Sequence, residues 1–141
     1  MGTNYYSVKR GVEELDGDAF WDLHAFGEGD AVLHIGKSSG GWCFSLHIIP
    51  ERGINDLWDW LDMFLDPDRI IINEYRDNIP ISDMMRTITQ CSRPEPNFWD
   101  DDTMQKNYAE PGPANLVRHQ LGHGCVKHGI GTWDCIIGRF S

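Results

Sequence analysis

The clearest pattern in the sequence is a two-residue period over residues 42–49, where large apolar side chains alternate with Cys43, Ser45, His47 and Ile49. Every second residue from Trp42 to Ile48 is apolar, which is the side-chain period of a β-strand with one buried face. Residues 31–35 have the composition of a second strand, and the glycines and serines of residues 36–41 are typical of a turn between strands. The pattern therefore predicts a β-hairpin.

Two segments have the 3.6-residue period of helices. The first, at about residues 55–65, follows a candidate N-cap at Asn55 and stops before Pro67. The second, at about residues 82–90, begins at the candidate cap Ser82 and gathers methionine and isoleucine on one face. Both segments predict short amphipathic helices.

The rest of the chain predicts strands joined by irregular segments. Residues 3–8 and 70–75 are rich in aromatic and β-branched types, and residues 116–140 are predicted to hold two strands around a glycine- and histidine-rich connection. Residues 11–30 stay ambiguous because four glycines interrupt any period, and residues 92–115 are predicted to form a long loop rich in proline and aspartate. This mixture without regular alternation favours an α+β fold, with a mainly antiparallel sheet in a single globular domain.

Composition and charge narrow the class of protein. The 141 residues include 22 acidic and 12 basic side chains, for a formal net charge of −10, and 14 of the acidic ones lie in residues 51–110. This balance argues against a nucleic-acid-binding protein, which needs a positive surface to displace counterions from phosphates. No apolar run approaches the ~20 residues of a membrane span, and no export signal opens the sequence, so we expect a cytoplasmic protein that does not bind membranes.

The first predicted helix carries a row of aspartates without basic neighbours. Their positions fall within about 120° of the helix circumference, and none has a lysine or arginine four residues later. They are Asp56, Asp59, Asp62 and Asp66. Together with the acidic run at residues 100–102, they predict an interface that docks on a basic surface of another protein. The alternative is a solvated face that keeps the protein soluble.

The predicted hairpin turn contains a candidate site for an anion. Lys37, Ser38 and Ser39, with Trp42 beside them, would present a cation, two hydroxyls and an aromatic ring to a small nucleotide-like ligand. The alternative is a set of solvated turn residues. Residues 31–38 also satisfy the loosest phosphate-loop pattern, but a strand on either side leaves no helix N-terminus for a phosphate, which argues against nucleotide hydrolysis by this loop.

A histidine-rich segment further along is a candidate metal site. His119, His123, Cys125 and His128 supply four nitrogen and sulfur donors within ten residues, and these are the ligand types of a tetrahedral zinc site. Bound zinc would support a hydrolase or a nuclease. The alternative is a glycine-rich turn whose histidines hydrogen-bond to the backbone.

Three further residues are candidates for a catalytic site. His34 and His47 lie on the two strands of the predicted hairpin, and Asp134 lies on the last predicted strand. A histidine whose far nitrogen is oriented by a carboxylate is the usual general-base arrangement. Because no nucleophile lies at a recognisable spacing, the alternative is that both histidines serve only as core residues.

Three blocks of the sequence resemble a family of small bacteriophage proteins. They are Met-Gly-Thr-Asn-Tyr-Tyr at residues 1–6, His-Ile-Gly-Lys-Ser-Ser-Gly-Gly-Trp at residues 34–42 and His-Gly-Ile-Gly-Thr-Trp-Asp at residues 128–134. The resemblance implies a phage product acting in the cytoplasm of the infected bacterium. Members of the family often carry a Cys-x-x-Cys pair before the second block, whereas residues 11–30 of this chain contain no cysteine.

These observations lead to one main hypothesis and two alternatives. The main hypothesis is a non-enzymatic anti-defence protein, anti-CRISPR-like or of another kind, that binds and inhibits a host or defence protein with a basic surface. The first alternative is a metal-dependent hydrolase or nuclease that uses the histidine and cysteine cluster. The second is a protein that sequesters a small anionic ligand. The main hypothesis requires no cofactor. The sequence leaves open whether the chain forms a dimer.

Overall fold

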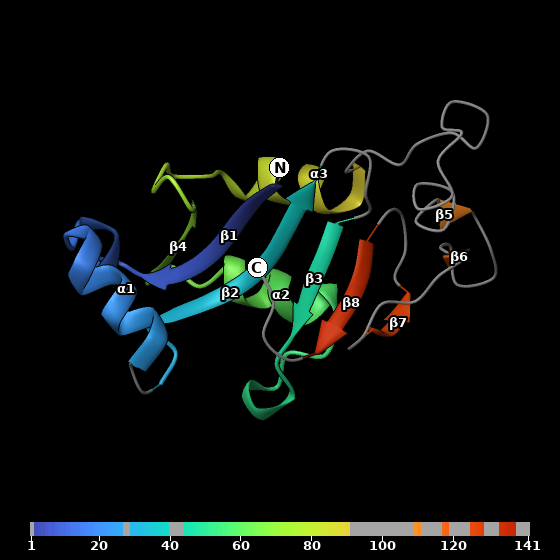
Figure 1. The fold of residues 1–141 in the computed structure, drawn as a ribbon, viewed down its shortest axis with the longest axis horizontal. Helices are drawn as coiled ribbons and strands as arrows, with labels where there is room; N and C mark the ends of the chain where they lie inside the picture. Colours follow the sequence, from blue (N-terminus) through green and yellow to red (C-terminus); the bar gives the residue numbers. More distant parts are fainter. Residues whose placement is uncertain are drawn as a thin grey trace.

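A computed structural model describes residues 2–26, 29–39, 44–90, 109–110, 117–118, 125–128 and 133–137. The described strands form a six-stranded sheet with the order β4-β1-β2-β3-β8-β7 (Figure 1). Its strands are β1 (Gly2–Lys9), β2 (Val32–Ser39), β3 (Phe44–Ile48), β4 (Arg69–Asn73), β7 (Cys125–His128) and β8 (Trp133–Ile137). Two short strands, β5 (Ala109–Glu110) and β6 (Val117–Arg118), pair in a second sheet.

Neighbouring strands of the described six-stranded sheet run antiparallel except at one place. β1 pairs with β2 and β4, β2 pairs with β3, and β7 pairs with β8, all antiparallel, whereas β3 and β8 are parallel. The predicted α+β fold with a mainly antiparallel sheet is therefore confirmed, as is the predicted hairpin. The predicted loop over residues 92–115 lies outside the described residues, apart from β5.

In the part of the chain that the structure describes, three α-helices accompany the sheet. They are α1 (Gly17–Phe26), α2 (Leu57–Phe64) and α3 (Ile81–Gln90). Single turns of 3₁₀-helix, η1 (Val12–Glu14) and η2 (Pro50–Arg52), lie in the connections. Both predicted helices are confirmed, while α1 occupies the segment that the sequence left ambiguous. None of these helices is long and apolar enough to cross a membrane.

The caps of the two predicted helices differ from those expected. The N-cap of α2 is Asp56 rather than Asn55, and its side chain accepts a hydrogen bond from the backbone N–H of Asp59. Ser82 lies inside α3, whose first residue is Ile81. Capping by Asp56 satisfies one of the N–H groups that the first turn of a helix leaves unpaired.

The main hydrophobic core lies between the sheet and the helices α2 and α3. Figure 1 shows both helices behind the sheet. Phe44 and Leu46 of β3 are fully buried, as their alternation predicts, and they share one cluster with Trp60 of α2 and Ile88 of α3. Cys135 of β8 joins the same cluster. We call this side of the sheet the helix face.

A smaller cluster covers the opposite side of the sheet. It consists of Tyr6, Val8, Phe20 and Ile72. Phe20 comes from α1, and its ring meets the Tyr6 ring edge-on with centroids 6.2 Å apart. His34 and His47 lie on this side as well, so we call it the histidine face.

Strand β2 continues past the point where the sequence predicts a turn. It runs to Ser39, because Gly36 allows the strand to stay paired on both sides. The register with β1 shifts next to Gly36, and an added Cβ there would overlap the backbone carbonyl oxygen of Ser45 on β3. The prediction of a turn beginning at residue 36 is therefore wrong, because this glycine serves a close approach between strands.

A buried cation lies at the start of β4. The Arg69 side chain is only 2 % exposed, and its Nε and Nη2 atoms donate to the hydroxyl and carbonyl oxygens of Ser7, each at 2.9 Å. Asp30 faces it, with Oδ2 3.6 Å from Arg69 Nη1 and Oδ1 3.1 Å from Lys9 Nζ. The hydrogen bond from Lys9 is the main cause that lowers the pKa of Asp30, while burial lowers the pKa of Arg69.

Candidate functional site

The two histidines of the hairpin meet on the histidine face. Their Nδ1 atoms lie 3.2 Å apart, and their ring centroids are 5.2 Å apart. His34 Nε2 lies 2.8 Å from the side-chain oxygen of Asn4, and His47 Nδ1 lies 3.1 Å from the backbone oxygen of His34. The structure thus brings together the two histidines that the sequence places on adjacent strands.

These contacts indicate where the protons sit. A carbonyl oxygen can only accept, so the His47 Nδ1 beside the His34 carbonyl carries a proton. The same N–H reaches His34 Nδ1, which therefore accepts, and the His34 proton lies on Nε2, where it donates to Asn4. With these directions His34, together with Asn4, orients the ring of His47.

Two residues of β1 that the sequence analysis did not single out support the pair. The backbone N–H of Asn4 donates to Glu74 Oε1 at 2.9 Å, and the Asn4 carbonyl accepts from the Glu74 N–H at 2.9 Å. The Tyr6 ring lies 5.4 Å from the His34 ring, and burial together with the nearby Glu74 carboxylate raises the pKa of Tyr6 to about 12. An asparagine inside an aromatic strand is the signal that could have identified Asn4, since asparagine is depleted in strands.

Asp134, the third candidate catalytic residue, belongs to β8. The strand register pairs Asp134 with Ser45 and pairs Ile136 with His47. The side chain of Asp134 lies outside the described part of the structure. The orienting group that the structure does show at the histidine pair is the Asn4 amide.

The candidate zinc ligands fall largely outside the described residues. His119 and His123 are in segments that the structure does not describe, and Cys125 and His128 are described only as backbone of β7. Strand β7 lies next to β8, and β8 lies next to β3, so both backbone positions are two strands from the histidine pair. Among the side chains described, no group of three or more His, Cys, Asp or Glu is placed to hold a metal ion.

Two of the candidate anion-binding residues, Lys37 and Ser38, lie in a strand and not at a turn. Lys37 and Ser38 are half-buried residues of β2, and Lys37 pairs with both β1 and β3. Ser39 ends the same strand, and Trp42 lies outside the described residues. The expected turn position of Lys37 and Ser38 is therefore wrong, because strand pairing uses the backbone groups that an anion cradle needs.

The four aspartates along α2 have different structural roles. Asp56 accepts from the backbone N–H of Asp59 at 3.0 Å, and Asp59 in turn accepts from the backbone N–H of Asn55 at 2.9 Å. Asp66 accepts from a backbone N–H two residues later. Asp62 is exposed and makes no hydrogen bond within the described residues. Two of the four predicted interface residues therefore stabilise the start of α2.

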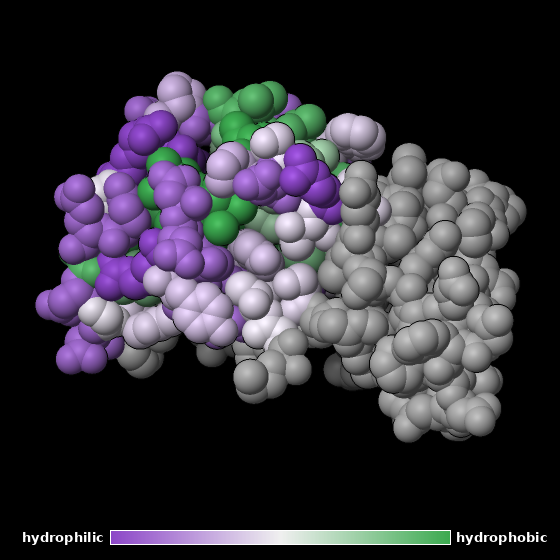
Figure 2. Space-filling view, turned by 90° about the horizontal axis from the view of Figure 1, so that it is seen from above, coloured by the Kyte–Doolittle hydropathy of each residue, from purple (hydrophilic) through white to green (hydrophobic). Residues whose placement is uncertain are grey.

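Two large apolar side chains lie exposed beside these aspartates. Trp58 is 58 % exposed and Leu65 is 62 % exposed. With Asp62 between them, they have the i, i+4, i+7 spacing that places residues on one side of a helix. We call Trp58, Asp62 and Leu65 the α2 stripe. Figure 2 shows hydrophobic groups gathered among hydrophilic ones on one face of the molecule.

Comparison with known proteins adds no family to this description. No family model matches the sequence, and neither a curated protein nor a solved structure matches it. The function is therefore argued from the side chains themselves, of which the α2 stripe and the histidine pair are the candidate groups.

Proposed function

We propose that the protein binds a basic surface of another protein through the α2 stripe and inhibits that partner without catalysing a reaction. The observation that carries this proposal is the exposure of Trp58 and Leu65 on either side of Asp62. Tryptophan is among the residue types that most often contribute binding energy at the centre of protein interfaces, and apolar surface gains free energy when a partner covers it.

The charge of the protein supports a basic partner. The net charge is −10, and residues 51–110 hold 14 of the 22 acidic side chains. Charge of this sign accelerates encounter with a positive surface and opposes encounter with a negative one. A complementary surface would combine an apolar hollow for Trp58 with lysine or arginine around it.

The setting that we propose is the cytoplasm of an infected bacterium, with a host or defence-system protein as the partner. The support comes from the sequence, since residues 1–6, 34–42 and 128–134 resemble blocks of small bacteriophage proteins. A small acidic protein in this setting inhibits its target by covering a basic surface that otherwise binds nucleic acid.

Substitutions in the α2 stripe test this function. We expect the double variant Trp58→Ala, Asp62→Lys to lose about 2 kcal/mol or more of binding free energy, because it removes an apolar anchor and reverses a charge. The melting temperature should change little, since both side chains are exposed. The measurement is capture of proteins from a bacterial lysate on the immobilised wild type and variant, followed by titration of the captured partner.

Tyr75→Ala is the matched control, because Tyr75 is 68 % exposed and lies outside α2. The control should retain the same basic partner as the wild type. Equal retention by the wild type, the double variant and the control would show that the α2 stripe is not the interface. Capture of no basic protein by the wild type would contradict the function itself.

One feature of the strand register favours a second function, metal-dependent hydrolysis. Strand β8 joins β7 to β3, so that His128 pairs with Asp134, and Ile136 pairs with both Cys125 and His47. The backbone positions of the candidate zinc ligands Cys125 and His128 therefore lie on β7, two strands from His47. Imidazole and thiolate donors are the ligands that zinc prefers, and zinc activates water for hydrolysis.

Native mass spectrometry tests this second function. The purified protein is expected to exceed its denatured mass by about one zinc ion, to lose the excess on chelation, and to lose it in the His128→Ala variant, because a tetrahedral site needs all its ligands. His24→Ala is the control, since residue 24 belongs to α1. A wild-type protein that stays metal-free after incubation with zinc would exclude this function.

A further inference from the structure

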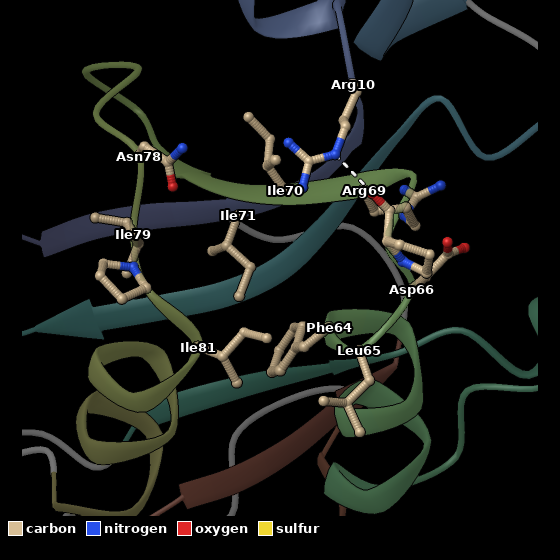
Figure 3. Close-up of a pocket in the computed structure, with 12 residues that line it drawn as sticks. Arg10, Phe64, Leu65, Asp66, Arg69, Ile70, Ile71, Asn78, Ile79 and Ile81 are labelled. Carbon is tan, nitrogen blue, oxygen red and sulfur yellow. Dashed lines mark hydrogen bonds between the residues drawn. The ribbon is translucent and has the colours of Figure 1, made fainter.

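A groove opens along the outer edge of β4, between the end of α2 and the residues that lead into α3 (Figure 3). Its volume is about 300 Å³, at the lower end of the range for binding sites. Phe64, Ile71, Ile79 and Ile81 line its apolar part, and Figure 3 shows the side chains of Ile71, Ile81 and Phe64 close together there. The edge of a sheet is therefore accessible beside an apolar hollow.

The hydrogen bonds at both ends of β4 show which of its backbone groups face outward. Strand β4 is one of the two edge strands of the described sheet, with β1 as its neighbour. At one end the N–H of Arg10 donates to the carbonyl of Asp68, and at the other the N–H of Glu74 donates to the carbonyl of Asn4. Because strand residues alternate, the even-numbered residues bond to β1, and the backbone groups of residues 69, 71 and 73 point away from it.

Two of these outward groups have no hydrogen-bond partner among the residues that the structure describes. The N–H of Arg69 donates to the carbonyl of Asp66 at 3.1 Å, and the carbonyl of Ile71 accepts from the N–H of Ile79 at 2.8 Å. Residues 77–79 run back along β4 and cover its outer edge from Ile71 to Asn73. Within the described residues, no hydrogen bond reaches the N–H of Ile71 or the carbonyl of Arg69.

This N–H and this carbonyl form a matched pair for one residue of an extended chain. They belong to the two peptide units that flank Ile70, and both point away from β1. A residue running parallel to β4 fits between them, with its N–H donating to the Arg69 carbonyl and its carbonyl accepting from the Ile71 N–H. Residues paired across neighbouring strands point to the same face of a sheet. The side chain of the bound residue therefore lies on the same face as Ile70, and the side chains of the residues before and after it point toward the apolar hollow.

Positive charge lies where that central side chain would be. Arg10 donates from Nε to the carbonyl of Pro67 at 2.6 Å, and Figure 3 shows its guanidinium next to Ile70. The side chain of Arg69 lies on the opposite face of β4, where it is 2 % exposed and bonds to Ser7 and Asp30. The guanidinium group of Arg10 at this place favours a carboxylate.

We propose that β4 binds an extended segment of a partner protein, with an acidic residue at its centre and an apolar residue on each side. The groove shares Leu65 with the α2 stripe, but binding there uses the backbone of β4 and can be measured without any knowledge of the partner of α2. A second copy of this chain is not the occupant that fits. If the β4 strands of two copies paired with each other about Ile70, residues 77–79 of each copy would collide with β4 of the other copy.

Amide hydrogen exchange with short peptides tests this site. In the protein alone, the Ile71 amide should exchange about tenfold or more faster than the amides of Ile70 and Ile72, although all three lie in one strand. Millimolar acetyl-Val-Glu-Val-amide should slow exchange at Ile71 by about threefold or more. The same peptide N-methylated at glutamate, and acetyl-Val-Lys-Val-amide, should have no such effect.

Charge-reversal variants separate specific binding from general attraction. Arg10→Glu should abolish protection of the Ile71 amide by the acidic peptide, whereas Arg52→Glu should preserve it. Arg52 is a matched control, because it is exposed and also donates to a backbone carbonyl, that of Gly29, outside the groove. An Ile71 amide that exchanges as slowly as that of Ile72 in the free protein would overturn the proposal, as would equal protection by the lysine peptide.

Discussion

Replacing Gly36 with alanine is expected to lower the free energy of unfolding by about 3–5 kcal/mol, a large share of the stability of a domain of this size. The added methyl group would overlap the backbone carbonyl oxygen of Ser45 and come within 2.5 Å of Phe44 Cε1. Both neighbours belong to β3, which is fixed between β2 and β8, so the strand cannot move aside without breaking its pairing.

Urea unfolding followed by circular dichroism measures this effect. Gly17→Ala is the control, because an added methyl group at Gly17 meets nothing within 4 Å and this glycine begins α1. The control should be neutral or slightly stabilising, since alanine is the better helix former. Equal unfolding midpoints for the two variants would show that β2 and β3 do not approach closely at Gly36.

Truncation of Trp60 is expected to be the other severe substitution. Trp60→Ala should lower the free energy of unfolding by about 3–5 kcal/mol, because it leaves a cavity in the core of the helix face. The side chain is fully buried, stacks on Phe64 with ring centroids 6.0 Å apart, and donates from Nε1 to the backbone carbonyl of His47 at 2.7 Å. This hydrogen bond joins α2 to β3, the strand that carries His47.

Trp60→Phe separates the two contributions of this side chain. It keeps much of the ring volume but removes the donor to the His47 carbonyl, at an expected cost of about 1–3 kcal/mol. Trp58→Ala is the control and should stay within about 0.5 kcal/mol of the wild type, because Trp58 is exposed. Denaturant titrations that rank Trp58→Ala as more destabilising than Trp60→Ala would contradict the assigned inner face of α2.

Local periodicity was enough to predict much of the fold. The alternation around Phe44 and Leu46 predicted the buried face of β3, and the spacing of Met84 and Ile88 predicted the inner face of α3. The segment containing α1 was left ambiguous because its glycines break any period, although Phe20 anchors the helix through contacts to β1. Helices held by packing of this kind cannot be recognised from propensity alone.

The site residues show the same division between local and distant information. His34 and His47 could be placed together because a hairpin joins their strands within a few residues. The contacts of Asn4 and Arg69 could not be predicted, because their partners, His34 and Ser7, lie 30 and 62 residues away along the chain. The open edge of β4 depends on the return of residues 77–79, so no sequence pattern within β4 indicates it.

The parallel pairing of β3 with β8 has a consequence for synthesis on the ribosome. Phe44 pairs with Trp133, 89 positions later, so β3 emerges long before the strand that will cover its second edge. At ordinary translation rates the interval is roughly 4–18 s, far longer than the microseconds in which a hairpin forms. During this time β2 and β3 can already be paired while the other side of β3 offers a template for neighbouring nascent chains. Fragments that end before residue 133 should therefore aggregate even where α2 and α3 have folded.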